Sequence, residues 1–163
     1  MIKVVVGASR NSEGKIGSEA IQWWMGTDYS HVYVRWHLTT QDKEVVYHAA
    51  SGMVHFVSLD NFTKHNTIVR EFDLYLTDDQ FKKFSARCID LAGEKYSYIE
   101  LLQIFLSDVS GGKIRLKDQP GYICSELLCE LFDSLGIQLN KPKFLVRPDD
   151  IVKALEKHEN SRF

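Results

Sequence analysis

The spacing of apolar residues changes part-way along this chain of 163 residues. Up to about residue 76, apolar and β-branched residues form short runs or alternate with polar ones, which is the pattern of β-strands. We predict a short helix over 18–25, with Ser18 as N-cap and Gly26 past its end, and a hairpin turn at Ser51-Gly52. The strands predicted from this pattern cover 2–6, 31–38, 45–50, 53–59 and 67–76.

From Thr77 onward the apolar residues recur at helical spacing. Loops are expected at 8–17 and 110–120, where glycine and polar residues gather. Because strands fill the first half and helices the second, we predict an α+β fold, an antiparallel sheet packed against helices, in a single domain over 1–163. The predicted helices cover 78–93, 98–106, 124–135 and 148–157.

Charge and composition exclude several classes of protein. The 20 basic and 22 acidic residues are mixed along the chain, so we expect no nucleic-acid partner. No apolar run reaches about 18 residues, which excludes a transmembrane helix of the usual kind. Three cysteines without framework spacing argue against a disulfide scaffold. The start of the sequence lacks a secretory signal, so we expect a cytoplasmic protein unless a separate route such as phage lysis delivers it.

Cys124 follows a Pro-Gly loop and opens a predicted helix with leucines at 127, 128, 131 and 135. Free N–H groups and the dipole at a helix N-terminus favour a thiolate, so we expect a lowered thiol pKa and a nucleophilic role. The alternative is a small buried residue that continues the leucine stripe. Cys88 and Cys129 lie within apolar helix patterns, and we expect both to be structural.

Four histidines fall within 25 residues, which raises the question of a base or a metal site. His31 begins a strand, where its side chain can reach the rim of the sheet and act as a base toward a thiol. The turn at 51–52 places His48 opposite His55. This pair could share an ion, but no acidic residue lies near it on these strands and zinc needs three or four ligands. We therefore expect no metal and no other cofactor.

The order of these segments resembles that of a known family. Ser30-His31-Val32 precedes Tyr122-Ile-Cys124-Ser125-Glu126-Leu127 by about ninety residues. Weaker matches are Val46-Tyr47-His48-Ala49, the segment 93–98 and Arg147-Pro148-Asp149-Asp150-Ile151. Together they are similar to the circularly permuted NlpC/P60 papain-like superfamily, which includes the YiiX/YaeF-like cysteine amidases and peptidases. In that family the histidine strand comes early and the cysteine helix late, the reverse of papain.

The resemblance implies a permuted papain-like fold and a role for each matching residue. Cys124 would be the nucleophile, His31 the base that deprotonates it, and His48 the third residue that orients the imidazole. A histidine orients an imidazole less strongly than a carboxylate does, because it carries no negative charge. Tyr122 and Tyr29 would line the substrate site, or serve as packing residues.

The function that follows is a cysteine hydrolase that cleaves an amide bond in a peptide, a cell-wall peptide or a lipid amide. One alternative is an acyltransferase or thioesterase acting on a lipid, as in related lecithin:retinol-acyltransferase-like proteins. The other is a non-catalytic binding module on the same fold, since a fold does not fix a function.

Overall fold

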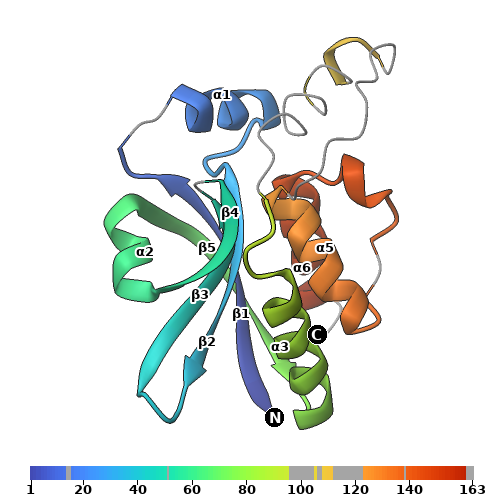
Figure 1. Ribbon diagram of the computed structural model, residues 1–163. Coiled ribbons are helices and arrows are strands. Elements are labelled where there is room, and N and C mark those ends of the chain that lie inside the picture. The colour runs from blue at the N-terminus through green and yellow to red at the C-terminus, as the bar shows by residue number, and fades with distance from the viewer. Residues whose placement is uncertain are drawn as a thin grey trace.

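The computed structural model describes residues 1–13, 16–50, 52–95, 105, 108–111, 123–137 and 139–160 (Figure 1). Its strands form one antiparallel sheet in the order β4-β3-β2-β1-β5. The predicted α+β class with an antiparallel sheet is therefore confirmed. The strands are β1 (Ile2–Asn11), β2 (His31–Leu38), β3 (Lys43–Ala50), β4 (Met53–Ser58) and β5 (Asn66–Leu76).

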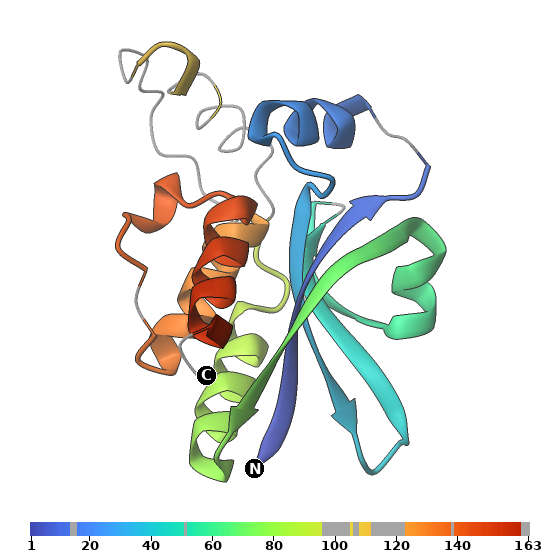
Figure 2. The ribbon, with the colours of Figure 1, turned by 180° about the vertical axis from the view of Figure 1, so that it is seen from behind.

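Helices cover both faces and one end of this sheet. Figures 1 and 2 show α3, α5 and α6 together on one face, α2 on the other, and α1 across the end of the sheet at which β2 begins. No helix among the described residues is long and apolar enough to cross a membrane. The helices are α1 (Ile16–Met25), α2 (Leu59–His65), α3 (Asp78–Leu91), α5 (Cys124–Ser134), the 3-10 turn η1 (Lys143–Leu145) and α6 (Pro148–Asn160).

The main core lies between the sheet and α3, α5 and α6. Alternate residues of β2, namely Val32, Val34 and Trp36, belong to it, as strand geometry requires. The leucine stripe predicted for α5 faces the same core, with Leu127, Leu128 and Leu131 fully buried. Burial of these apolar side chains is the main force that holds α5 against the sheet.

Tyr33 lies on the other face of the sheet, in a row that crosses three strands. It pairs with Gly7 of β1, and Gly7 pairs in turn with Glu71 of β5. The Tyr33 hydroxyl donates a hydrogen bond of 2.7 Å to Glu71 Oε1, so the ring passes over Gly7. A Cβ at Gly7 would lie 2.2 Å from Tyr33 Cζ. Only glycine leaves room for this crossing.

The start of the chain differs from the sequence prediction in two places. β1 continues to Asn11 rather than ending at Val6, because β2 and β5 pair with it on both sides and satisfy its backbone. The helix α1 begins at Ile16, two residues early, so Ser18 is not its N-cap. The Ser18 hydroxyl instead lies 2.6 Å from the Ser30 hydroxyl.

Helix α2 was not predicted at all. It has seven residues, begins after Ser58, whose hydroxyl accepts from the Asn61 N–H, and buries only Phe62. A helix with one buried side chain has no apolar stripe from which to predict it.

The later helices agree with the prediction. Thr77 and Gln80 form a capping box at the start of α3, and α5 begins at Cys124 as expected. The helix expected over 98–106 and the loop expected over 110–120 lie almost wholly outside the described residues, of which Phe105 and 108–111 are the exceptions.

Candidate functional site

The first residue of β2 and the sixth residue of β3 bring two imidazoles together. His31 Nε2 and His48 Nδ1 lie 3.0 Å apart, which is hydrogen-bonding distance. His48 is 5% exposed, and His31 is half-buried. The hairpin pairs His48 with His55 across β3 and β4, as the two-residue turn predicted. Their ring centroids are 4.7 Å apart.

Phe62 of α2 covers the two imidazoles on one side. Its ring centroid lies 5.2 Å from that of His48 and 6.5 Å from that of His31. The histidine pair therefore lies in an apolar setting on the α2 side of the sheet, with His55 as its nearest polar ring.

This setting keeps both imidazoles neutral at pH 7. Burial, helped by the nearby His55, lowers the pKa of His31 to about 4. Burial, with His31 and His55 beside it, lowers the pKa of His48 to about 2. A neutral imidazole has one N–H donor and one free acceptor nitrogen, so the pair can share one hydrogen bond and keep an acceptor.

Cys124 opens α5 and is 3% exposed. Burial raises the pKa of its thiol to about 11, although backbone hydrogen bonds from Val32 and Ser125 oppose this by stabilising the thiolate. The predicted lowering of this pKa is therefore wrong. The helix N-terminus does favour the charged form, but the loss of water around the sulfur costs more.

The thiol and the histidine pair lie at the same end of the sheet. Val32, whose backbone bonds the Cys124 sulfur, directly follows His31. Figure 1 shows the first turn of α5 near the end of the sheet at which β2 begins. Among the residues that the structure describes, however, no hydrogen bond joins the Cys124 thiol to an imidazole. Cys124 packs with Val32 in the main core, whereas His31 contacts Phe62 on the other side.

A pocket of about 1090 Å³ opens beside the histidine pair, beneath α1. His31, His48 and His55 line it. It is apolar where Trp24 of α1 and Phe105 line it, and polar near the end of β1, where Asn11 and its β5 partner Asn66 line it. The volume is sufficient for a ligand of the size of a short peptide or a lipid amide.

The remaining site residues named from the sequence divide into two groups. Tyr29 is 6% exposed and belongs to the main core, where burial raises its pKa to about 12, so its side chain does not line the pocket as a substrate-binding role would require. Tyr122 lies outside the described residues. Cys88 and Cys129 are buried in the core, as expected for structural residues, and burial raises the pKa of Cys129 to about 12.

No group of three or more His, Cys, Asp or Glu side chains that could hold a metal ion is present in the described part of the chain. His55 Nδ1 lies 3.2 Å from the Met53 carbonyl oxygen, and His48 Nδ1 is engaged with His31. One ring nitrogen of each of these histidines is therefore already committed to another group.

Sequence reasoning gave no site role to Phe62 or Arg147 and no definite one to Trp24. Phe62 lies on the unpredicted helix α2, and Trp24 belongs to an aromatic pair that could line an apolar groove or pack in the core, a choice that the sequence left open. Arg147, at the start of α6, lies over the Trp24 ring with its guanidinium carbon 5.4 Å from the ring centroid. The Trp-Trp pair in α1 was the one visible signal, since two adjacent tryptophans on a ten-residue helix cannot both face the core.

No protein-family model matches the chain, and no curated protein is significantly similar to it.

Proposed function

We propose that this protein is a cysteine hydrolase of amide bonds on a permuted papain-like fold, with Cys124 as nucleophile and His31 as base. The observation that carries the proposal is the hydrogen bond between His31 Nε2 and His48 Nδ1, next to the strand residue whose backbone bonds the Cys124 sulfur. It supplies a fixed imidazole and a positioning residue at the end of the sheet where the Cys124 thiol opens α5.

The hydrogen bond is compatible with a tautomer of His31 that can act as a base. When His31 Nε2–H donates to His48 Nδ1, the other ring nitrogen, His31 Nδ1, keeps its lone pair and can accept a proton. His48 then orients the base without carrying charge. Such a pair works from a neutral thiol and a neutral imidazole, in keeping with the directions of both pKa shifts.

The reaction would proceed in two halves. The thiol proton of Cys124 moves to His31 as the sulfur bonds to the substrate carbonyl carbon, and backbone N–H groups in the first turn of α5 stabilise the oxyanion. The C–N bond then breaks and His31 returns the proton to the leaving amine. Water hydrolyses the resulting thioester by the same steps. The mechanism requires a thiol–imidazole contact, and this contact would have to form through a movement of one of the two side chains as substrate binds.

Two alternatives each have an observation in their favour. The apolar end of the pocket, with Trp24 and Phe105, favours an acyltransferase or thioesterase acting on a lipid. The burial of the Cys124 thiol favours a non-catalytic binding module on this fold. A cytoplasmic location remains an expectation from the sequence.

The test is turnover of amide and ester substrates by wild type and four variants. We expect Cys124→Ala and His31→Gln to lose at least about 10²-fold in kcat/KM, the usual scale of a general-base contribution. The matched controls are Cys129→Ala on the same helix and His37→Gln on the same strand, and both should keep wild-type turnover. Full activity in Cys124→Ala would exclude the proposal, and a preference for transfer to an alcohol over water would favour the acyltransferase.

A further inference from the structure

The pocket beneath α1 differs in polarity between its two ends. β1 runs into the start of α1, so Asn11, with Asn66 paired to it on β5, lies near the beginning of this helix, and Trp24 lies at its far end (Figure 1). A helix of ten residues is about 15 Å long, so the two ends are well separated. A ligand that fills the pocket must therefore place a polar part near β1 and an apolar part near Trp24.

The apolar end is a corner made by two aromatic rings. Trp24 and Phe105 meet edge to face, with centroids 5.6 Å apart and an angle of 90° between the rings. Both line the pocket. Two rings in this arrangement present one flat wall and one edge, a surface that an apolar group fills with good contact.

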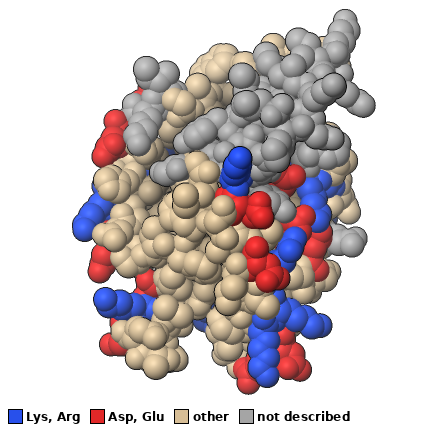
Figure 3. Space-filling model, in the orientation of Figure 1, with Lys and Arg blue, Asp and Glu red and all other residues tan. Residues whose placement is uncertain are grey.

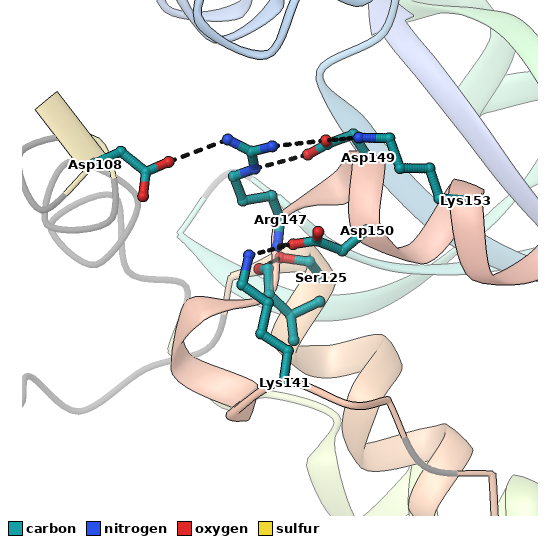
Figure 4. Close-up of polar contacts among 8 residues, drawn as sticks. Asp108, Ser125, Lys141, Arg147, Asp149, Asp150 and Lys153 are labelled. Carbon is teal, nitrogen blue, oxygen red and sulfur yellow. Dashed lines mark hydrogen bonds and ion pairs between the residues drawn. The ribbon is translucent and has the colours of Figure 1, made fainter. Parts of the chain in front are cut away.

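Arg147 holds the tryptophan of this corner in place. Its guanidinium lies over the Trp24 ring, where the ring quadrupole attracts a cation. Figure 4 shows the same guanidinium held by two parallel hydrogen bonds of 2.8 Å to Asp149 and by one of 3.1 Å to Asp108. Asp149 is 1% exposed and also accepts from Lys153.

The carboxylate of Asp149 fixes Arg147 more firmly than a surface ion pair would. The fork of two hydrogen bonds sets the plane of the guanidinium, and burial of Asp149 makes any other arrangement costly. The pKa of Asp149 is lowered by Lys153 and Arg147 in spite of its burial. The start of α6 is thereby linked through Arg147 to the pocket wall on α1.

We propose that the Trp24–Phe105 corner is a subsite for an apolar group of the substrate, and that Arg147 is the positioning residue that holds the corner in shape. That the bound apolar group belongs to a substrate rests on the proposed hydrolase function. That the corner binds an apolar group does not depend on that function. The substrate class is accordingly an amide with a large apolar substituent near the scissile bond and a polar part toward Asn11.

The first test measures binding alone, by fluorescence titration with N-phenyl-1-naphthylamine, a neutral apolar probe. Trp24→Ala should weaken binding about tenfold, which corresponds to about 1.4 kcal/mol. Arg147→Lys keeps the charge beside Asp149 but loses the flat fork, and should weaken binding about threefold. The control Lys153→Met removes the other cation at Asp149 without touching Trp24, and should bind as wild type does.

The second test uses p-nitrophenyl acetate and octanoate. Relative to wild type, the ratio of octanoate to acetate kcat/KM should fall in Trp24→Ala and Arg147→Lys and stay constant in Lys153→Met. Trp24→Ala could lower the ratio by unfolding the protein. Arg147→Lys retains an ion pair with Asp149 and leaves Trp24 in place, so it tests the subsite without removing a large side chain. The subsite is disproved if wild type does not bind the naphthylamine, or if Trp24→Ala and Arg147→Lys both bind it as tightly as wild type does. A third outcome separates the two proposals. If wild type turns over neither ester and Cys124→Ser still binds the naphthylamine, the hydrolase proposal is refuted and the apolar subsite is retained.

Discussion

The reactivity of Cys124 depends on two opposing effects at its sulfur. The first turn of α5 and the backbone of Val32 stabilise a thiolate, while burial destabilises it, and burial has the larger effect. Burial likewise destabilises the charged form of His31 and lowers its pKa to about 4. The pair is therefore neutral at pH 7 and differs from a thiolate–imidazolium pair, in which the thiol pKa falls and the imidazole pKa rises.

This neutral state predicts the pH dependence of alkylation. The thiolate is the reactive form, and with a pKa of about 11 its fraction rises about tenfold per pH unit from about pH 7 to about pH 10. The rate of iodoacetamide modification at Cys124, followed by mass spectrometry, should rise in the same way. It should respond little to His31→Gln, since no ion pair is lost. A plateau that begins below about pH 8 and disappears in His31→Gln would show that the ion pair exists after all.

At this scale the sequence predicts residue identities better than environments. The family resemblance brought His31 and His48 together, and the ring nitrogens His31 Nε2 and His48 Nδ1 do lie 3.0 Å apart. The pKa of Cys124 could not be predicted, because it depends on how completely β2 and the helices cover the sulfur. That coverage comes from residues distant in the sequence, such as Val32.

At the scale of elements, β1 lies between β2 and β5 and must let Tyr33 cross it. Tyr33 packs on Phe62 of α2, with centroids 4.6 Å apart, and reaches over Gly7 to Glu71. Arg35 binds the same carboxylate at 2.7 Å. This row connects β2, β1 and β5 on the α2 face.

Substitution of Gly7 should test this connection. In Gly7→Ala the new methyl group would overlap the Tyr33 ring, so either the ring or β1 must move, at a cost of about 1–3 kcal/mol in the free energy of unfolding. The control Gly17→Ala adds the same methyl group on α1, where nothing lies within 4 Å, and should be neutral or stabilise by roughly 0.5 kcal/mol. Urea unfolding of both variants beside wild type decides the matter, and equal stabilities would mean that Tyr33 has an alternative rotamer at no cost.

The elements also show where pattern reading works. Strands with one buried face, such as β2, and helices with a leucine stripe, such as α5, were found near their true bounds. The end of β1 was missed because Ser9 is polar and yet 0% exposed, a result of pairing on both sides. The spacing of apolar residues indicates which face of a strand or helix is buried. It does not indicate whether other strands pair with a strand along both of its edges.

For the molecule as a whole, surface charge and buried charge follow different rules. Acidic and basic side chains are interspersed on the face shown in Figure 3, in keeping with the net charge of −2. The buried or half-buried titratable groups are instead arranged so that one form is strongly preferred. His31 and His48 prefer the neutral form, while Asp149, Glu71 and Glu130 have lowered pKa values and prefer the charged form.

These preferences act on stability in two separate ranges of pH. An imidazole with an ordinary pKa of 6.5 that falls to about 4 on folding binds a proton in the unfolded chain first, so stability decreases as pH falls from about 6.5 to about 4. A carboxylate with a lowered pKa contributes stability that is lost only below its ordinary pKa of 3.8 for Asp149 or 4.5 for Glu71. Loss of stability between about pH 6.5 and 4.5 therefore comes from the histidines.

We predict that the free energy of unfolding decreases over this range by at most about 1.4 kcal/mol per pH unit for each of the two histidines. His48→Gln removes one titrating group and should reduce the slope by about half, whatever its effect at neutral pH. Thr77→Ala, which removes the N-cap of α3, should instead lower stability by about 1 kcal/mol at every pH and leave the slope unchanged. Urea unfolding of the three proteins at four pH values from about 7.5 to 4.5 measures both quantities. If wild type and His48→Gln lose stability in parallel, then His48 takes up a proton as readily in the folded protein as in the unfolded chain, and the lowered pKa of His48 would be wrong.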